Sequence, residues 1–226
     1  MTNKYMYFIA NWKMYGDLKT LNSLDKIINF SKMNRKNKFR IIYCPQNTLI
    51  RPMFKRFKKT NIEVGAQNCH ESNNFGAYTG HVNSNMLKNI GAKYIILGHS
   101  ENRQEGDDDK LINSKIKSAQ KAGLKIIFCI GETIKDKKKK KTNKVLASQI
   151  KNGLKSIKNK SNILLAYEPV WSIGTGLIPK QNELFDIIKF IKNKNKNYKV
   201  LYGGSVNPKN INELKSINNI DGYLIG

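Results

Sequence analysis

The sequence of 226 residues is poor in the residues that build metal centres and disulfide frameworks. It has three histidines and three cysteines, and Cys44, Cys69 and Cys129 stand far apart without forming a CxxC pair. Structural zinc sites use closely spaced cysteine and histidine pairs, and small secreted domains use several disulfides. The sequence therefore predicts no metal site and a reducing, cytoplasmic environment.

Long apolar segments are also missing. No run of apolar residues approaches the ~18 residues or more that a membrane-spanning helix needs. The first residues, MTNKYMYFIANWK, contain neither a long apolar stretch nor a cleavage site of small residues. We therefore expect no membrane partner and no signal peptide.

Acidic residues are scarce: 16 stand against 41 lysines and arginines, which gives a net charge of +25. Such an excess is typical of proteins that bind nucleic acids or membrane surfaces. Here, however, lysines recur in nearly every helical segment, and the densest run, 134–144, has no aromatic residue on which a base could stack. This distribution indicates solvated surfaces, with 134–144 as a solvated connection into a helix, and no specific nucleic-acid partner. The positive field should still attract small anions.

Short apolar segments recur along the chain, and several are continuous rather than alternating, as in parallel strands covered on both faces. Segments 17–32 and 182–194 between them have helical spacing. Gly123 fits a helix C-terminus and Asn207-Pro208 a helix start. Strict alternation predicts one α/β domain over 1–226, a closed (β/α)8 barrel that appears truncated after strand eight, without an eighth helix. The predicted strands are 5–10, 39–44, 61–66, 92–98, 124–131, 162–168, 198–204 and 220–226.

Polar residues stand where these strands end, and barrel active sites are built at the carboxyl ends of strands. The first strand runs into ANWKMYG, the fourth into LGHSENR, the sixth into AYEPVWSIGTG and the seventh into YGGSV. We expect a lysine, a histidine and a carboxylate to meet at the barrel mouth, where glycine and serine N–H groups suit a phosphate. The resulting candidates are Asn11, Lys13, His99, Glu168, Ser205 and Gly226.

Seven motifs occur in one order: NWKM, VGAQN, GAYTG, LGHSE, CIGE, AYEPVWSIGTG and YGGSVNP. In this order and at these spacings the sequence resembles the triosephosphate isomerase family over essentially its whole length. The resemblance implies a TIM barrel and a cofactor-free aldose–ketose isomerase of glycolysis and gluconeogenesis. Its substrates would be the phosphorylated trioses dihydroxyacetone phosphate and D-glyceraldehyde 3-phosphate, interconverted through an enediolate. The resemblance also implies a homodimer, in which segment 67–80 inserts beside Lys13 of a partner.

The chemistry assigns roles to the matching residues. Glu168 suits a base that moves a proton between adjacent carbons. His99 would polarise the substrate oxygens as a neutral imidazole if a helix begins after it. Lys13 would supply a fixed positive charge. The resemblance implies that Asn11 lines the substrate site and orients Lys13. The N–H groups of Gly174, Ser205 and Gly226 would bind the phosphate, whereas Glu101, Cys129 and Glu132 support the site.

The stretch AYEPVWSIGTG predicts a lid that protects a reactive enediolate from water. Proline restricts the backbone after Glu168, and Gly174 and Gly176 permit the turns that fold a loop onto a ligand. Residues 169–171 would then form a stiff hinge.

The sequence departs from the family at three positions. The chain ends after the first of two glycines usual at strand eight, so we expect a truncated record. His81 and Asn102 replace a glutamate and an arginine that commonly pair across the family's dimer interface. Another phosphate-binding barrel isomerase or aldolase, an anion- or nucleic-acid-binding protein that keeps the barrel, and an inactive relative remain as alternatives.

Overall fold

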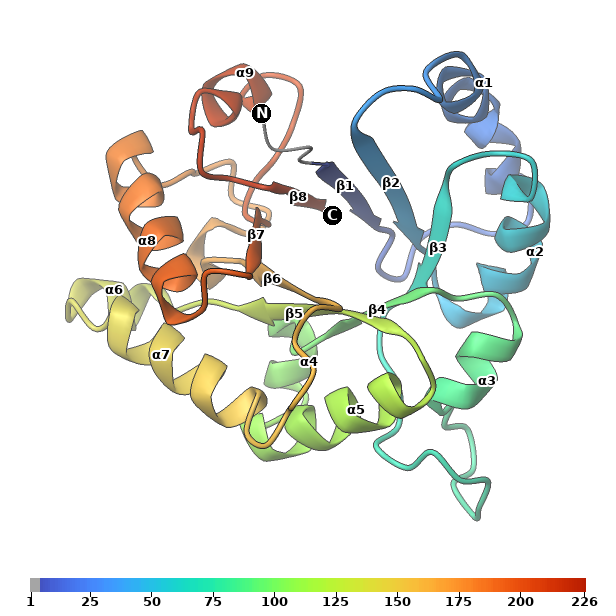
Figure 1. Ribbon diagram of the computed structural model, residues 1–226, viewed down its shortest axis with the longest axis horizontal. Helices are drawn as coiled ribbons and strands as arrows, with labels where there is room; N and C mark the ends of the chain where they lie inside the picture. The colour runs from blue at the N-terminus through green and yellow to red at the C-terminus, as the bar shows by residue number, and fades with distance from the viewer. Residues whose placement is uncertain (1–4) are drawn as a thin grey trace.

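The computed structural model describes residues 5–226, which form a closed barrel of eight parallel strands (Figure 1). Each strand pairs with the next, and β1 and β8 close the barrel through pairs such as Phe8 with Tyr223. Every predicted strand segment overlaps one observed strand, so the barrel prediction is confirmed. The expectation of no signal peptide concerned the first residues of the sequence, and residues 1–4 of that segment lie outside the part that the structure describes. The strands are β1 (Met6–Asn11), β2 (Phe39–Cys44), β3 (Glu63–Ala66), β4 (Tyr94–Leu97), β5 (Lys125–Ile130), β6 (Ile163–Tyr167), β7 (Lys199–Tyr202) and β8 (Gly222–Ile225).

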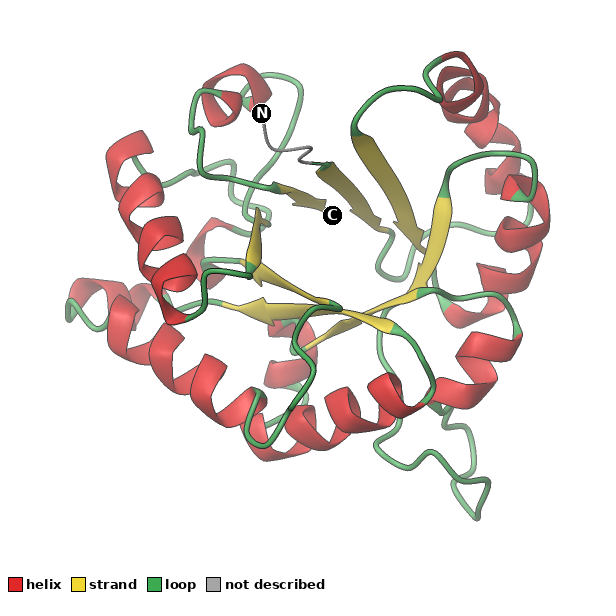
Figure 2. Cartoon of the chain, viewed as in Figure 1, coloured by secondary structure: helices red, strands yellow, loops and turns green. Residues whose placement is uncertain are grey.

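Helices surround the barrel (Figure 2). No helix within residues 5–226 is both long and apolar enough to cross a bilayer. The helices are α1 (Asp25–Met33), α2 (Asn47–Phe57), α3 (Ser84–Asn89), α4 (Ser100–Gln104), α5 (Asp109–Lys121), α6 (Ile134–Lys138), α7 (Thr142–Gly153), α8 (Gln181–Lys194) and α9 (Ile211–Lys215), with 3₁₀ helices η1 (Lys19–Leu24) and η2 (Val170–Ser172).

Segment 182–194 coincides with α8, and Gly123 follows α5 at a φ of 76°, as predicted. Segment 17–32 is not one α-helix, because its first half is the 3₁₀ helix η1. The side chain of Asp17 accepts hydrogen bonds from the Thr20 N–H and hydroxyl, which favours a tight turn over a regular helix start.

Of two further predictions about helices, one was wrong and one is confirmed. The lysine-rich run 134–144 is not simply a connection, since it contains α6, which begins with a reciprocal capping box between Thr133 and Asp136. The cap predicted at Asn207-Pro208 lies in the turn that leads into α9, whose regular helix begins at Ile211. The Asn207 side chain accepts hydrogen bonds from the Lys209 and Asn210 N–H groups at 2.9 and 3.3 Å, and its main-chain oxygen accepts the Ile211 N–H at 3.1 Å, as at a helix N-cap followed by proline.

The core has two layers, which follow from the alternation of side chains along each strand. One buried cluster fills the barrel, and a larger one lies between the barrel and its helices. Tyr7, Ile9 and Asn11 share the inward face of β1, and Leu164, Ala166 and Glu168 share that of β6. These two strands thus lead from apolar interior residues to a polar residue at the carboxyl end. The interior cluster comprises Tyr7, Ile9, Ile42, Cys44, Tyr94, Ile96, Ile127, Cys129, Leu164, Ala166, Leu201 and Leu224.

Candidate active site

A cavity of about 310 Å³ opens at the carboxyl ends of the strands. All the residues predicted from the sequence to act on or bind a substrate line it. They come from the carboxyl ends of five different strands or from the loops that follow them, so the barrel brings together residues up to 215 positions apart. The residues are Asn11, Lys13, His99, Glu168, Gly174, Ser205 and Gly226.

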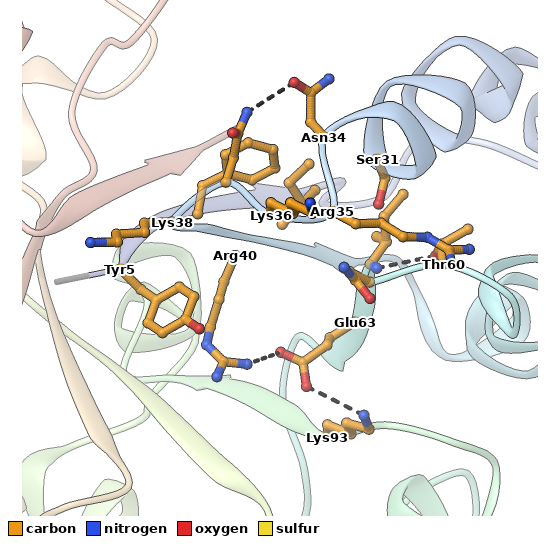
Figure 3. A pocket seen from close by; sticks show the side chains of 15 residues that line it. Tyr5, Ser31, Asn34, Arg35, Lys36, Lys38, Arg40, Thr60, Glu63 and Lys93 are labelled. Carbon is orange, nitrogen blue, oxygen red and sulfur yellow. Dashed lines mark hydrogen bonds and ion pairs between the residues drawn. The ribbon is translucent and has the colours of Figure 1, made fainter. Parts of the chain in front are cut away.

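A larger cavity, of about 520 Å³, lies at the amino ends of β2 and β3 (Figure 3). Arg40 and Lys93 line it, but both pair with Glu63 at 3.3 Å, and none of the predicted site residues reaches it. Volume therefore does not identify the reactive site, whereas the convergence of polar groups at the other end does.

Glu168 directly follows β6, and its backbone N–H donates to Ile130 O at 2.8 Å, which extends the pairing with β5. The residue is only 4% exposed. Oε1 lies 3.6 Å from His99 Nε2, and Oε2 has no hydrogen-bond partner among residues 5–226. Burial raises the pKa of Glu168 above its ordinary 4.5, while His99, the Cys129 thiol and Lys13 act against that rise. The carboxylate is thus a stronger base than a solvated one.

His99 joins β4 to α4 and is the N-cap of that helix. Its Nδ1 accepts a hydrogen bond from the Glu101 N–H at 3.3 Å, which assigns the proton of a neutral imidazole to Nε2. Nε2 is the nitrogen that faces Glu168 and the cavity. The sequence-based condition, a helix that begins just after His99, is therefore met.

Lys13 has a φ of 48°, a left-handed conformation that non-glycine residues rarely adopt. Its N–H donates to Asn11 Oδ1 at 3.1 Å, and its carbonyl accepts from Gln67 Nε2 at 2.8 Å. These bonds fix the backbone so that the side chain points over the barrel mouth. There Nζ pairs with Glu101 Oε1 at 2.6 Å, and that carboxylate is half exposed.

The stretch after Glu168 folds over the cavity. Pro169 precedes η2, and Gly174 and Gly176 both have positive φ, 69° and 77°. Gly176 N–H donates to Ser205 Oγ at 3.0 Å, and Ser205 Oγ donates to Ser172 O at 2.6 Å. The stretch is therefore docked on the loop after β7.

Comparison with known proteins agrees with this geometry. The family model described as triosephosphate isomerase matches residues 6–226. The chain belongs to the triosephosphate isomerase family. It is 40% identical to the triosephosphate isomerase of Thermodesulfovibrio yellowstonii, over 97% of this chain and 92% of that protein. It is also 40% identical to that of Dictyoglomus thermophilum, over 96% and 91%. The crystal structure of triosephosphate isomerase from Bartonella henselae superposes with a TM-score of 0.88 at 33% identity and covers 98% of this chain and 92% of its own.

Membership of the triosephosphate isomerase family gives the activity. The chain is an intramolecular aldose–ketose isomerase that interconverts dihydroxyacetone phosphate and D-glyceraldehyde 3-phosphate, a step of glycolysis. Within residues 5–226, no group of three or more histidine, cysteine, aspartate or glutamate side chains is placed to hold a metal ion.

Sequence reasoning missed two residues that shape this isomerase site. Ser172 is fully buried, and its Oγ lies 3.1 Å from Tyr202 Oη and 3.3 Å from the Ser205 N–H, so it joins the stretch after Glu168 to β7 and to the loop that follows β7. Gly203 packs directly on Glu168, since a Cβ there would lie 2.6 Å from Glu168 Cγ. The Gly-Gly pair in YGGSV was a signal for Gly203, whereas no pattern in the sequence pointed to Ser172.

Proposed function

We propose that Glu168 is the base that carries the proton between the two carbons of the triose. The observation that supports this role is the pair of Glu168 Oε1 and His99 Nε2, 3.6 Å apart on one wall of the cavity. The unpartnered Oε2 is free to accept a proton from carbon, and burial strengthens it as a base. A carboxylate base beside a neutral histidine is the established pattern of this family, and we apply it here.

His99 and Lys13 stabilise the negative charge that develops on the substrate oxygens. His99 donates its Nε2 proton to an oxygen of the enediolate, because Nδ1 is already engaged by the Glu101 N–H. Lys13 contributes a fixed charge within the same cavity, and Asn11 holds the Lys13 backbone. Substrate binding then competes with Glu101 for the Lys13 ammonium.

The phosphate binds to N–H groups of Gly174, Ser205 and Gly226, which line the same cavity. The Ser205 N–H now donates to Ser172 Oγ at the long distance of 3.3 Å. A phosphate oxygen is a charged acceptor and forms a shorter, stronger bond than a hydroxyl does, so it displaces this contact. The lid formed by residues 169–176 closes over the bound ligand and excludes water, as is established for the family.

A coupled isomerase assay on single variants tests these assignments. Glu168→Gln and His99→Gln should each lower kcat by orders of magnitude, whereas Lys13→Met should also raise KM, because it removes a charge that binds the phosphate dianion. Wild-type kinetics in any one variant would remove that residue from its role. The same assay addresses the alternative of an inactive relative.

We further propose that residues 1–226 act as one domain within a cytoplasmic homodimer. In segment 67–80, Phe75 is 78% exposed and Tyr78 49%, which leaves a large apolar surface at the end of a long loop. A second cavity, of about 190 Å³ and lined by Gln67, Glu101 and Asn102, adjoins Lys13 and offers a place for such a loop from a partner. Sedimentation should give a dimer at micromolar concentration that dissociates in Phe75→Asp; a monomeric wild type would contradict the proposal.

A further inference from the structure

One lysine of the run 134–144 differs from its neighbours. Lys137 lies on α6, and its side chain is only 28% exposed. Its Nζ lies 3.9 Å from the centroid of the Trp171 ring and 2.7 Å from Glu183 Oε1 of α8. Lys135, Lys138 and the lysines that follow are exposed. The run thus contains one cation that is placed by contacts with two other elements.

The ring that Lys137 covers belongs to the hinge of the lid. A second contact holds the Trp171 ring at its edge, where the indole N–H donates to Glu132 Oε1 at 2.9 Å. Glu132 is only 1% exposed, and its main-chain oxygen also accepts the Val170 N–H at 3.0 Å. The indole is therefore held at its edge by a buried carboxylate and on its face by an ammonium group, whose own counter-charge is Glu183.

These contacts lie outside the substrate cavity. Neither Lys137 nor Glu183 lines it, so neither touches the triose. Trp171, however, stands three residues after Glu168. The next residue, Ser172, accepts a hydrogen bond from the Ser205 hydroxyl through its main-chain oxygen, and the same hydroxyl accepts the N–H of Gly176 near the end of the lid. A shift of the indole therefore moves both the start of the lid and its docking contact.

We propose that Lys137 is a positioning residue for the lid. Its ammonium group, held by Glu183, fixes the Trp171 ring against α6 and thereby favours the docked hinge in which Glu168 and Ser205 face the substrate. This inference rests on the proposed lid function of residues 169–176. It makes α6 and α8, which do not reach the substrate, part of the closing device.

The test compares Lys137→Gln with Lys138→Gln, which makes the same change of charge at an exposed neighbour on the same helix. Lys137→Gln should lower kcat about three- to tenfold, the loss expected for a partly buried cation–π contact, with KM changed less than about twofold. Lys137→Arg should restore kcat, because a guanidinium group also stacks on an indole and pairs with a carboxylate. Lys138→Gln should match the wild type.

A spectroscopic measurement separates positioning from a loss of stability. The chain has two tryptophans, so 5-fluorotryptophan labelling gives two ¹⁹F resonances, assigned with Trp171→Phe. Glycerol 3-phosphate, a three-carbon phosphate ester that has no carbonyl and so cannot react, should shift the Trp171 resonance in the wild type and in Lys138→Gln, and shift it less in Lys137→Gln at saturation. Equal shifts and equal kcat in the two glutamine variants would overturn the inference and leave the lid intact. No ligand-dependent shift in the wild type would overturn the lid itself, and the inference with it.

Discussion

Shortening the side chain at position 168 by one methylene tests the distance on which the proposed proton transfer depends. Glu168→Asp withdraws the carboxylate by about 1.5 Å, one C–C bond length. In the structure Oε1 is 3.6 Å from His99 Nε2, so an aspartate leaves a gap of roughly 5 Å unless the backbone moves. A base has to come within ~2.6–3.2 Å of the atom whose proton it takes, and a misplacement of about 1 Å can cost ~100-fold. We expect kcat to fall by about 100- to 1000-fold.

The effect on the fold should be small. One buried methylene is worth about 0.8 kcal/mol, which corresponds to roughly 2–4 °C in a chain of this size. Turnover is measured in the coupled assay and unfolding by differential scanning calorimetry. Glu105→Asp, the same change in an exposed residue at the end of α4, is the control and should leave both unchanged. Turnover of Glu168→Asp within a few-fold of wild type would refute the reasoning, because the carboxylate's reach would not matter.

Two further predictions follow from the surroundings of Glu168. Because burial raises its pKa above 4.5, the native state holds the proton more tightly than the unfolded state, and the fold loses stability as pH rises from 4.5 through the native pKa. Glu168→Gln should therefore raise Tm at pH 7 while abolishing turnover, with the gain shrinking as pH falls toward 4.5; a Tm difference that does not vary with pH would contradict this sign. Gly203→Ala places a Cβ 2.6 Å from Glu168 Cγ and should lower kcat at least tenfold by displacing the base, with a Tm loss of only a few degrees. An active Gly203→Ala enzyme would show that the base tolerates displacement.

Much of the site could be predicted from the sequence because a barrel strand carries its functional residue at a fixed place. Asn11 and Glu168 each continue the inward face of an apolar strand, so the position of the strand determines where they lie. His99 is placed differently, because it shares the alternation of Ile95 and Leu97, which face the helices. The chain turns at Gly98, which has a φ of 75°, and the start of α4 determines which nitrogen of His99 faces the cavity.

The parts that could not be predicted depend on contacts between distant segments or on local side-chain bonds. Nothing in a run of consecutive lysines distinguishes Lys137, because its place depends on Glu183 and Trp171, which lie 46 and 34 residues further on. Helical spacing likewise cannot distinguish the 3₁₀ helix η1 from an α-helix. Residues three apart, such as the buried Leu21 and Leu24, lie on one face in either kind of helix.

The most direct test of the account follows the proton itself. D-glyceraldehyde 3-phosphate is converted in D₂O by the wild type and by Glu168→Gln, and the dihydroxyacetone phosphate formed is examined by ¹H NMR. If a side-chain carboxylate carries the proton through an enediolate, part of the wild-type product carries solvent deuterium on the carbon that receives the proton, and Glu168→Gln forms neither product nor exchanged substrate. A wild-type product entirely without deuterium, or equal exchange by Glu168→Gln, would contradict the assignment of Glu168 as the base.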